Sequence, residues 1–226
     1  MIFDQFLLAT SVLTRLPVAP DAPPAEGAVA EASWAFPAVG AGIGMVAAIV
    51  LFAAASLRLG EASAALLALA AGGLVTGALH EDGLADTLDG FGGGRDREAK
   101  LAIMRDSRCG TYGIIALIFS IGLRAAALVA IGSPIEAGLA LIAAHAASRA
   151  TLPAVMWRLA PARADGLGAL AGKPGLAPVL VAAAVGAFVA LGMLGPIRGL
   201  VALAVTALAA AATALLAKRQ IGGYTG

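Results

Sequence analysis

Three aspartates in the middle of the chain have the spacing of a metal site. Asp82, Asp86 and Asp89 fall within roughly a 60° arc if they lie on a helix that turns about 100° per residue. Carboxylates on one narrow face repel each other, and a bound divalent cation removes that repulsion. Oxygen ligands suit Mg²⁺ or Mn²⁺, which leave coordination positions open for phosphate. We therefore expect these three residues to bind Mg²⁺; the alternative is a solvated helix end.

Basic residues that follow the aspartates fit a phosphate-binding role. Arg105 and Arg108 flank Asp106 and Ser107, and arginine can hold phosphate oxygens through two parallel hydrogen bonds. Asp106 is either a further metal ligand or the partner of an arginine, and the spacing leaves both roles open. Bases in this stretch can also serve only as anchors at a membrane surface.

Other polar side chains lie within or beside apolar segments. Arginines inside a membrane usually face a cavity or a partner, and Arg149, one turn from His145, is expected to contact substrate. Arg124 either reaches the membrane surface or pairs internally. His80 is expected to support the site through a hydrogen bond rather than as a metal ligand. Lys173, in a glycine-rich polar segment, either contacts substrate or belongs to a plain loop.

The composition predicts an all-α, polytopic integral membrane protein. Of 226 residues, 60% are hydrophobic and 13% are charged, whereas average soluble chains carry roughly 25% charged residues. The apolar residues form long runs, as membrane spans require. Residues 1–16 predict an interfacial helix and residues 17–31 a loop. We expect a single membrane domain over residues 1–226 with about six to seven spans, the clear ones being residues 34–57, 62–79, 111–131, 135–157, 175–195 and 199–217.

Several glycines predict close helix packing and a helix break, and one aspartate predicts a helix cap. Gly40, Gly42 and Gly44 suggest close helix packing, and glycine-rich spans are compatible with a homo-oligomer. The glycines after Phe91 predict a helix break, and Asp96 predicts the cap of a short helix over residues 97–105.

Charge distribution predicts orientation. A net charge of +1 gives no basic field for nucleic acid, and the single cysteine, Cys109, cannot form an intramolecular disulfide. No signal peptide is evident at the start of the sequence. With residues 81–108 in the cytoplasm and alternating spans, the cytoplasmic side holds 11 lysines and arginines and the opposite side two. The positive-inside rule then predicts cytoplasmic catalytic loops.

Two runs resemble a known family. HEDGLADTLDG at residues 80–90 and IMRDSRCGTYG at residues 103–113 closely resemble the cobalamin synthase family, also called adenosylcobinamide-GDP ribazoletransferase. Further likeness extends along the whole chain. It lies in TRLP at residues 14–17, FPAVGAGIG at 36–44, SR at 148–149, GLG at 166–168 and GGYTG at 222–226.

The resemblance implies a reaction. Adenosylcobinamide-GDP and α-ribazole, or its 5′-phosphate, would give adenosylcobalamin, or its phosphate, and GMP, with Mg²⁺ as cofactor, in the bacterial inner membrane. Asp82, Asp86 and Asp89 would hold the metal, and Asp89 or Asp106 would accept the hydroxyl proton. The bases Arg105, Arg108 and Arg149 would hold phosphate or transition-state charge. The family would also continue beyond Gly226 with an aspartate and a further helix.

Two other classes of membrane protein compete with this interpretation. CDP-alcohol phosphotransferases share the Asp82-Gly83 pair, but their pattern D-G-x-x-A-R would require alanine at Asp86 and arginine at Thr87. Ion-coupled transporters place ionisable groups near the bilayer midplane in broken helices, whereas the acids here crowd one polar segment. A structural membrane scaffold is a third alternative, and it would not need the three aspartates.

Overall fold

All regular secondary structure in the described part of the chain is helical. The computed structural model describes residues 2–18, 20 and 25–225. Five helical segments are long and apolar enough to span a membrane, and a sixth span results if the bent pair of α4 and α5 is counted as one. The prediction of an all-α polytopic membrane protein is confirmed. The helices are α1 (Ile2–Leu13), α2 (Ala28–Ala32), α3 (Phe36–Ser56), α4 (Glu61–Thr76), α5 (Leu79–Gly93), α6 (Arg97–Ile103), α7 (Thr111–Ile131), α8 (Pro134–Arg158), α9 (Leu167–Ala171), α10 (Leu176–Leu194) and α11 (Pro196–Ile221).

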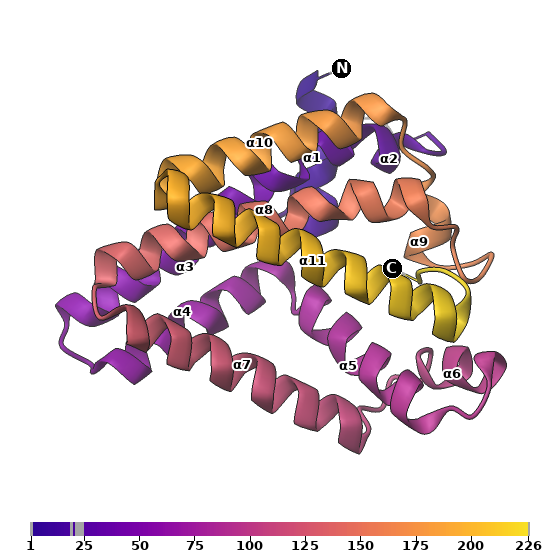
Figure 1. Ribbon diagram of the computed structural model, residues 1–226, viewed down its shortest axis with the longest axis horizontal. Helices are drawn as coiled ribbons and strands as arrows, with labels where there is room; N and C mark the ends of the chain where they lie inside the picture. The colour runs from indigo at the N-terminus through magenta and orange to yellow at the C-terminus, as the bar shows by residue number, and fades with distance from the viewer. Residues whose placement is uncertain (1, 19, 21–24, 226) are drawn as a thin grey trace.

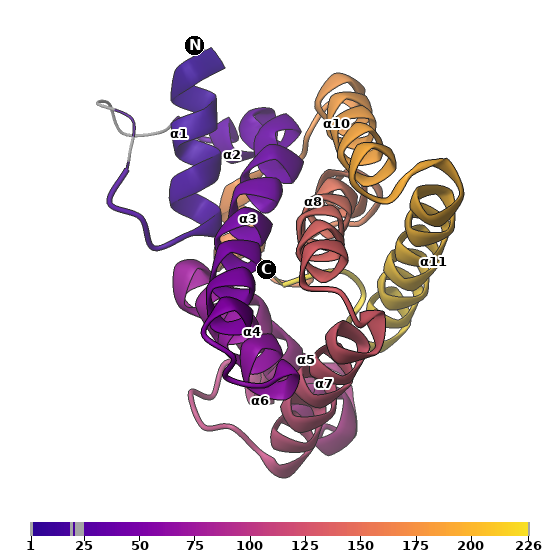
Figure 2. The same ribbon diagram turned by 90° about the vertical axis from the view of Figure 1, so that its left-hand side faces the viewer.

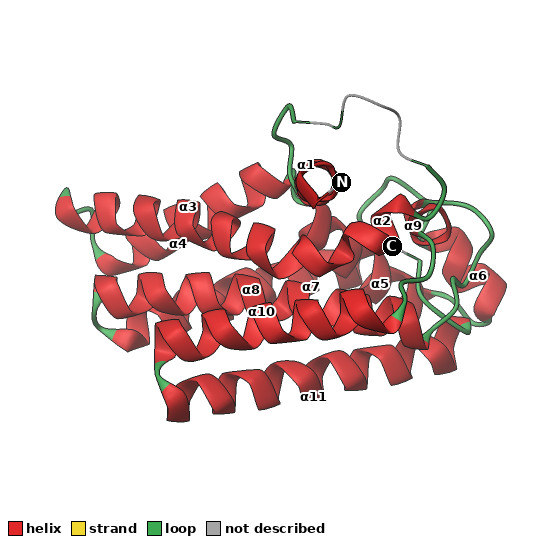
Figure 3. Cartoon of the chain, turned by 90° about the horizontal axis from the view of Figure 1, so that it is seen from above, coloured by secondary structure: helices red, strands yellow, loops and turns green. Residues whose placement is uncertain are grey.

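The long helices form a bundle whose two ends differ (Figure 1). One end, here called the turn end, holds the short connections at residues 57–60, 132–133 and 195. The opposite end, the loop end, holds residues 94–110, 159–175 and 222–225. Figure 2 looks along the bundle from the turn end, with α8 between α3, α10 and α11. Figure 3 shows that α1 runs across these helices.

Helix ends follow the capping residues. The predicted span at residues 111–131 is α7 itself, which ends at Gly132 in the left-handed conformation. Ser133 caps α8 by accepting from the Glu136 backbone N–H. Asp96 caps α6, as predicted, because its Oδ1 accepts from the Ala99 N–H at 2.9 Å.

Two of the three predicted packing glycines bring α3 against α8. A Cβ at Gly40 would overlap the His145 carbonyl oxygen, and one at Gly44 would lie 2.7 Å from the Ile142 Cα. Gly42 faces open space, so the prediction is wrong for that residue. Small residues at a helix contact let the backbones approach, which replaces the missing hydrophobic drive between helices in lipid.

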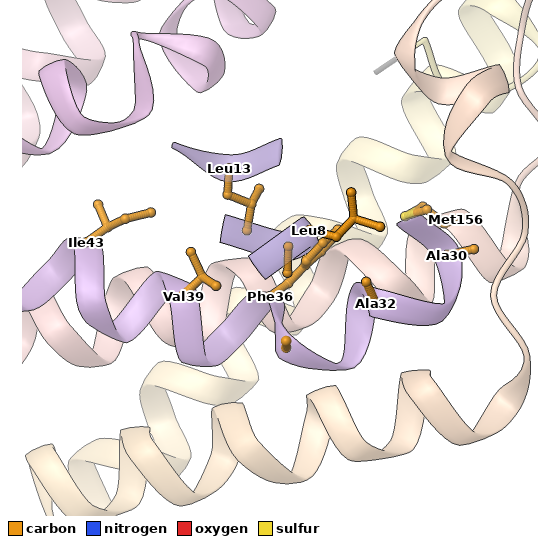
Figure 4. Packing of buried hydrophobic residues seen from close by; sticks show 10 residues of the cluster. Leu8, Leu13, Ala30, Ala32, Phe36, Val39, Ile43 and Met156 are labelled. Carbon is orange, nitrogen blue, oxygen red and sulfur yellow. The ribbon is translucent and has the colours of Figure 1, made fainter. Parts of the chain in front are cut away.

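A compact apolar cluster joins α1 to the start of α3. Leu8 and Leu13 of α1 pack with Phe36 and Ile43 of α3 and with Met156 of α8 (Figure 4). The predicted loop at residues 17–31 falls partly on residues 19 and 21–24, which lie outside the described residues. Its last part is helical instead, because the alanine-rich segment Ala28–Ala32 forms α2 and continues into α3.

The largest departure from the predicted fold is a sharp bend after α4. The two helices α4 and α5 meet at 91°, through Gly77 at φ +63° and Ala78 at φ +58°. The acidic stretch therefore begins as a new helix, which continues through Gly93 rather than breaking after Phe91. It runs from the middle of the bundle to the loop end (Figure 1). A left-handed alanine costs about 1–2 kcal/mol, so tertiary contacts must hold the bend.

Candidate functional site on helix α5

The predicted metal ligands lie on α5 in three different environments. Asp82 is exposed, Asp86 is half-buried and Asp89 is buried. Helical geometry keeps them within roughly a 60° arc, which we call the acid face. Within residues 2–18, 20 and 25–225, no three His, Cys, Asp or Glu side chains converge closely enough to hold a metal ion by themselves. A metal on the acid face would therefore need further ligands, such as substrate oxygens.

Asp89 holds the start of α7. Its Oδ2 accepts from the Gly110 N–H at 2.7 Å and its Oδ1 from the Gly113 N–H at 2.8 Å. A Cβ at Gly113 would overlap the carboxylate, so glycine is required for this approach. A carboxylate at the positive end of a helix satisfies N–H groups that have no partner within that helix. The sequence reasoning missed this contact between α5 and α7.

Arg163 is a cation beside the acid face that the sequence reasoning did not select. It lies between α8 and α9, and its charge acts on Asp86 together with those of Asp82 and Asp89. Its Nε and Nη1 atoms are buried without a hydrogen-bond partner, although Nε lies 3.9 Å from the Asp165 carboxylate. A buried guanidinium with unused N–H groups can bind an anion such as phosphate. The sequence feature that could have pointed to Arg163 as a site residue is its position in a glycine-rich polar segment.

The predicted phosphate clamp residues each hold a carboxylate. Arg105 pairs with Asp165 at 2.6 Å, and Arg108 pairs with Asp106 at 2.6 Å. Hydrogen bonds from the Arg108 side chain and backbone lower the pKa of Asp106 to about 2. Ser107 is exposed in the same segment. Of the two roles left open for Asp106, the structure shows the pairing with arginine.

The last described residues connect the segments at the loop end. Tyr224 exchanges backbone hydrogen bonds with Ala160 and Ala162, and Gly168 donates to the Thr225 carbonyl. The Arg97 side chain of α6 donates to the Ala162 and Ile221 carbonyls. These contacts explain the GLG and GGYTG runs, since a Cβ at Gly223 would overlap the Ala160 carbonyl oxygen. Lys173 lies exposed in this region, between α9 and α10.

Two predicted substrate-binding residues, His80 and Arg149, meet inside the bundle instead of at the loop end. The first turn of α5 brings His80 and Glu81 to Arg124 of α7 and to His145 and Arg149 of α8; these five residues are the bend cluster. Arg124 pairs with Glu81 at 3.3 Å, which decides between the two roles expected for that arginine. The bend after α4 carries His80 and Glu81 into the bundle, an arrangement that the sequence did not predict.

The fold and the site define a polytopic α-helical membrane protein with a carboxylate-rich broken helix. Comparison with known proteins gives the family: residues 5–226 match the model described as cobalamin-5-phosphate synthase. The chain therefore belongs to the cobalamin-5-phosphate synthase family.

Curated relatives extend over nearly all of the chain. It is 54% identical over 219 residues to an adenosylcobinamide-GDP ribazoletransferase of Bradyrhizobium diazoefficiens, a match that covers 97% of this chain and 84% of the relative. It is 45% identical over 225 residues to a protein of the same name from Mesorhizobium japonicum, covering 100% of this chain and 86% of the relative. No solved structure matches the chain.

Proposed function

We propose that the chain joins adenosylcobinamide-GDP to α-ribazole or its 5′-phosphate, forming adenosylcobalamin or its phosphate and releasing GMP. Its relatives carry the name of this transferase, and the family description names a 5-phosphate product. The structural observation that carries the proposal is the acid face, where Asp86 interacts with Arg163, whose Nε and Nη1 have no hydrogen-bond partner. Carboxylates and a guanidinium with unused N–H groups together suit a metal and phosphate groups.

The reaction breaks a phosphoanhydride bond of the pyrophosphate and forms a phosphoester bond. A ribose hydroxyl oxygen of the ribazole attacks the phosphorus that carries the cobinamide arm. The bond from that phosphorus to the GMP oxygen breaks, and GMP leaves with the electron pair. Such transfers depend on positioning and on neutralising the charge that develops on phosphate oxygens.

The residues present fit Mg²⁺ as a cofactor. Asp82 and Asp86 are one helical turn apart, and Mg²⁺ usually binds through one or two carboxylates together with substrate phosphates. Bound Mg²⁺ would neutralise the pyrophosphate and the departing GMP. Arg163 would hold a phosphate oxygen on the same side of α5. Asp89 remains a predicted third ligand, with lone pairs left after its two backbone hydrogen bonds.

Two acids remain proposed proton acceptors, and they differ in what already binds them. Asp89 is fixed by two N–H groups, and Asp106 is held ionised by Arg108. A low pKa makes Asp106 a weak base, which counts against it as the proton acceptor.

Exposed bases at the loop end would complete the binding of phosphate. The pair of Arg105 with Asp165 and the pair of Arg108 with Asp106 are exposed, and such pairs contribute only about 0–1 kcal/mol. Substrate phosphates can therefore replace the carboxylates at little cost. Ser107 and Lys173 are exposed at the same end and would add further contacts. The loop end would face the cytoplasm of a bacterial inner membrane, because most basic residues gather there.

One observation favours a transporter as a second candidate. The broken pair of α4 and α5 brings ionisable groups into the bundle, as secondary transporters do at their binding sites. The family match and the acid face favour the transferase instead. Turnover of a nucleotide-linked substrate by purified protein separates the two functions.

The proposal is tested by GMP release. Purified protein in detergent or liposomes would be supplied with adenosylcobinamide-GDP and α-ribazole 5′-phosphate, with and without Mg²⁺. Metal-dependent GMP release together with a corrinoid product is expected. Absence of release, with turnover of a CDP-alcohol instead, would contradict the assignment.

A further inference from the structure

The bend cluster contains a half-buried cation that lacks a close carboxylate partner among the described residues. Arg149 pairs with no acidic side chain within 4.0 Å among the described residues; its Nη1 donates to the Ser148 hydroxyl at 3.0 Å. Its Nε is buried without any hydrogen-bond partner. A buried charge without a partner is costly, especially inside a membrane bundle. Arg149 therefore lacks an acceptor that a ligand can supply.

Two imidazoles beside Arg149 also have unused nitrogen atoms. His80 Nε2 from α5 and His145 Nδ1 from α8 are buried without a hydrogen-bond partner in the described part of the chain. The two rings and Arg149 are close enough for their charges to interact. Helix α4 closes one side, since a Cβ at Gly72 would lie 3.6 Å from the His145 ring. Nitrogen atoms that can act as donors thus gather at one place from two helices.

The charge balance of the bend cluster indicates which kind of ligand it binds. Glu81 pairs with Arg124 through Oε1 at 3.3 Å, its charge also acts on Arg149, and its Oε2 is buried without a hydrogen-bond partner, so one carboxylate serves two guanidinium groups. With neutral imidazoles the five residues carry a net charge of +1. An anion with several acceptor oxygens would satisfy the guanidinium and both rings together.

We propose that the bend cluster binds a phosphate monoester. This inference rests on the proposed function for its natural ligand, because the acceptor ribazole 5′-phosphate and the product would both carry that group. His80 and Asp86 are six residues apart on α5, which places His80 about 9 Å along the helix from Asp86. The cluster would thereby distinguish ribazole 5′-phosphate from free ribazole.

Binding is tested first with inorganic phosphate, independently of catalysis. Thermal unfolding of the full chain in detergent would be measured in phosphate and in chloride at matched ionic strength. Phosphate should raise the melting temperature of the native chain by a few degrees. Arg149→Gln should abolish the rise, and Arg149→Lys should restore part of it. The control is Arg198→Gln, at an exposed pair with Glu136 near the turn end, which should leave the rise unchanged.

Either of two results would overturn the phosphate site. One is a native chain whose melting temperature does not respond to phosphate, and the other is an equal response in the native chain and Arg149→Gln. Should Arg149→Gln fail to fold, His145→Leu carries the same test, because it removes a donor from the same cluster without removing a charge.

Kinetics identify the source of the phosphate. Arg149→Gln should raise KM for ribazole 5′-phosphate about 10- to 100-fold, the worth of a hydrogen bond to a charged group, with kcat and the KM for free ribazole within twofold. Lost phosphate stabilisation with an unchanged KM would instead identify free phosphate or a lipid headgroup as the ligand. Phosphate binding by a chain that releases no GMP would contradict the proposed function and leave the phosphate site standing.

Discussion

The acid face lies on α5, whereas the bend cluster joins the first turn of α5 to α7 and α8, and the two have opposite charge imbalances. On the acid face, Asp82 and Asp86 outnumber Arg163, so the face favours a bound cation. In the bend cluster, Arg124 and Arg149 outnumber Glu81, so that cluster favours an anion. The bend after α4 separates the two, because it leaves the first turn of α5 among α7 and α8 and directs the rest to the loop end. One short helix can thereby present complementary sites for metal and phosphate.

Removing a charge from the acid face should have the largest effect on activity. Asp86→Asn should lower kcat about 10²- to 10³-fold, the typical cost of losing one electrostatic contact to a transition state. Steady-state GMP release over a range of Mg²⁺ concentrations measures this loss. The matched control is Glu98→Gln, an exposed acid on α6 at the same end, which should keep native activity. A folded Asp86→Asn with full Mg²⁺-dependent activity would remove the metal assignment.

A substitution that forces α3 away from α8, next to His145 of the bend cluster, should have the largest effect on the stability of the fold. Gly40→Ala would press a methyl group against the His145 carbonyl, and we expect a loss of about 3 kcal/mol in the free energy of unfolding. Gly42→Ala, on the open side of the same helix, should be neutral or slightly stabilising. Denaturation of both variants in detergent compares them. Equal destabilisation would show that the contact between α3 and α8 does not position His145.

Two aspartates of the acid face should differ in how much they stabilise the fold. Asp89→Asn places an amide donor against the N–H groups of Gly110 or Gly113, so the free energy of unfolding should fall by about 2 kcal/mol. Asp82→Asn, at an exposed side chain, should lose activity with an unchanged melting temperature. If both variants unfold at the native temperature, Asp89 does not hold α7.

The smallest effect is expected at Asp106, where the charge pair is exposed. Arg108 lowers the pKa of Asp106 to about 2, so the ionised form is favoured in the folded chain. The pair stabilises the folded chain at pH values above the ordinary pKa of an aspartate, and this stabilisation is lost as the pH falls through about 2. Arg108→Gln should raise the pKa toward its ordinary range, as followed by carboxyl carbon NMR. Arg95→Gln is the control, and an unchanged pKa in Arg108→Gln would contradict the pairing.

Local signals predicted much of the fold. Hydrophobic length placed the spans, and α7 begins and ends at the predicted residues because glycines flank it. The cap at Asp96 and the packing role of Gly40 also followed from residue type. The bend could not be predicted, because Ala78 adopts a left-handed conformation that alanine disfavours and that only tertiary contacts can hold.

The sequence identified residues of the site better than it predicted how they are arranged in space. The spacing of Asp82 and Asp86 identified the acid face, yet it could not show that Asp89 binds the start of α7, 21 residues further along the chain. Arg163 was overlooked because its nearness to Asp86 arises from the fold of the loop end. The interaction of His80 with Arg149 of α8 was not predicted, because it depends on the bend.

The two parts of α5 are compared most directly by measuring kcat and KM for both acceptors in Asp86→Asn and Arg149→Gln. Asp86→Asn should lower kcat with ribazole and with ribazole 5′-phosphate alike. Arg149→Gln should raise KM for the phosphorylated acceptor alone. If both variants changed the same constant to the same extent with both acceptors, α5 would carry one undivided site, and the separation of metal and phosphate roles would be wrong.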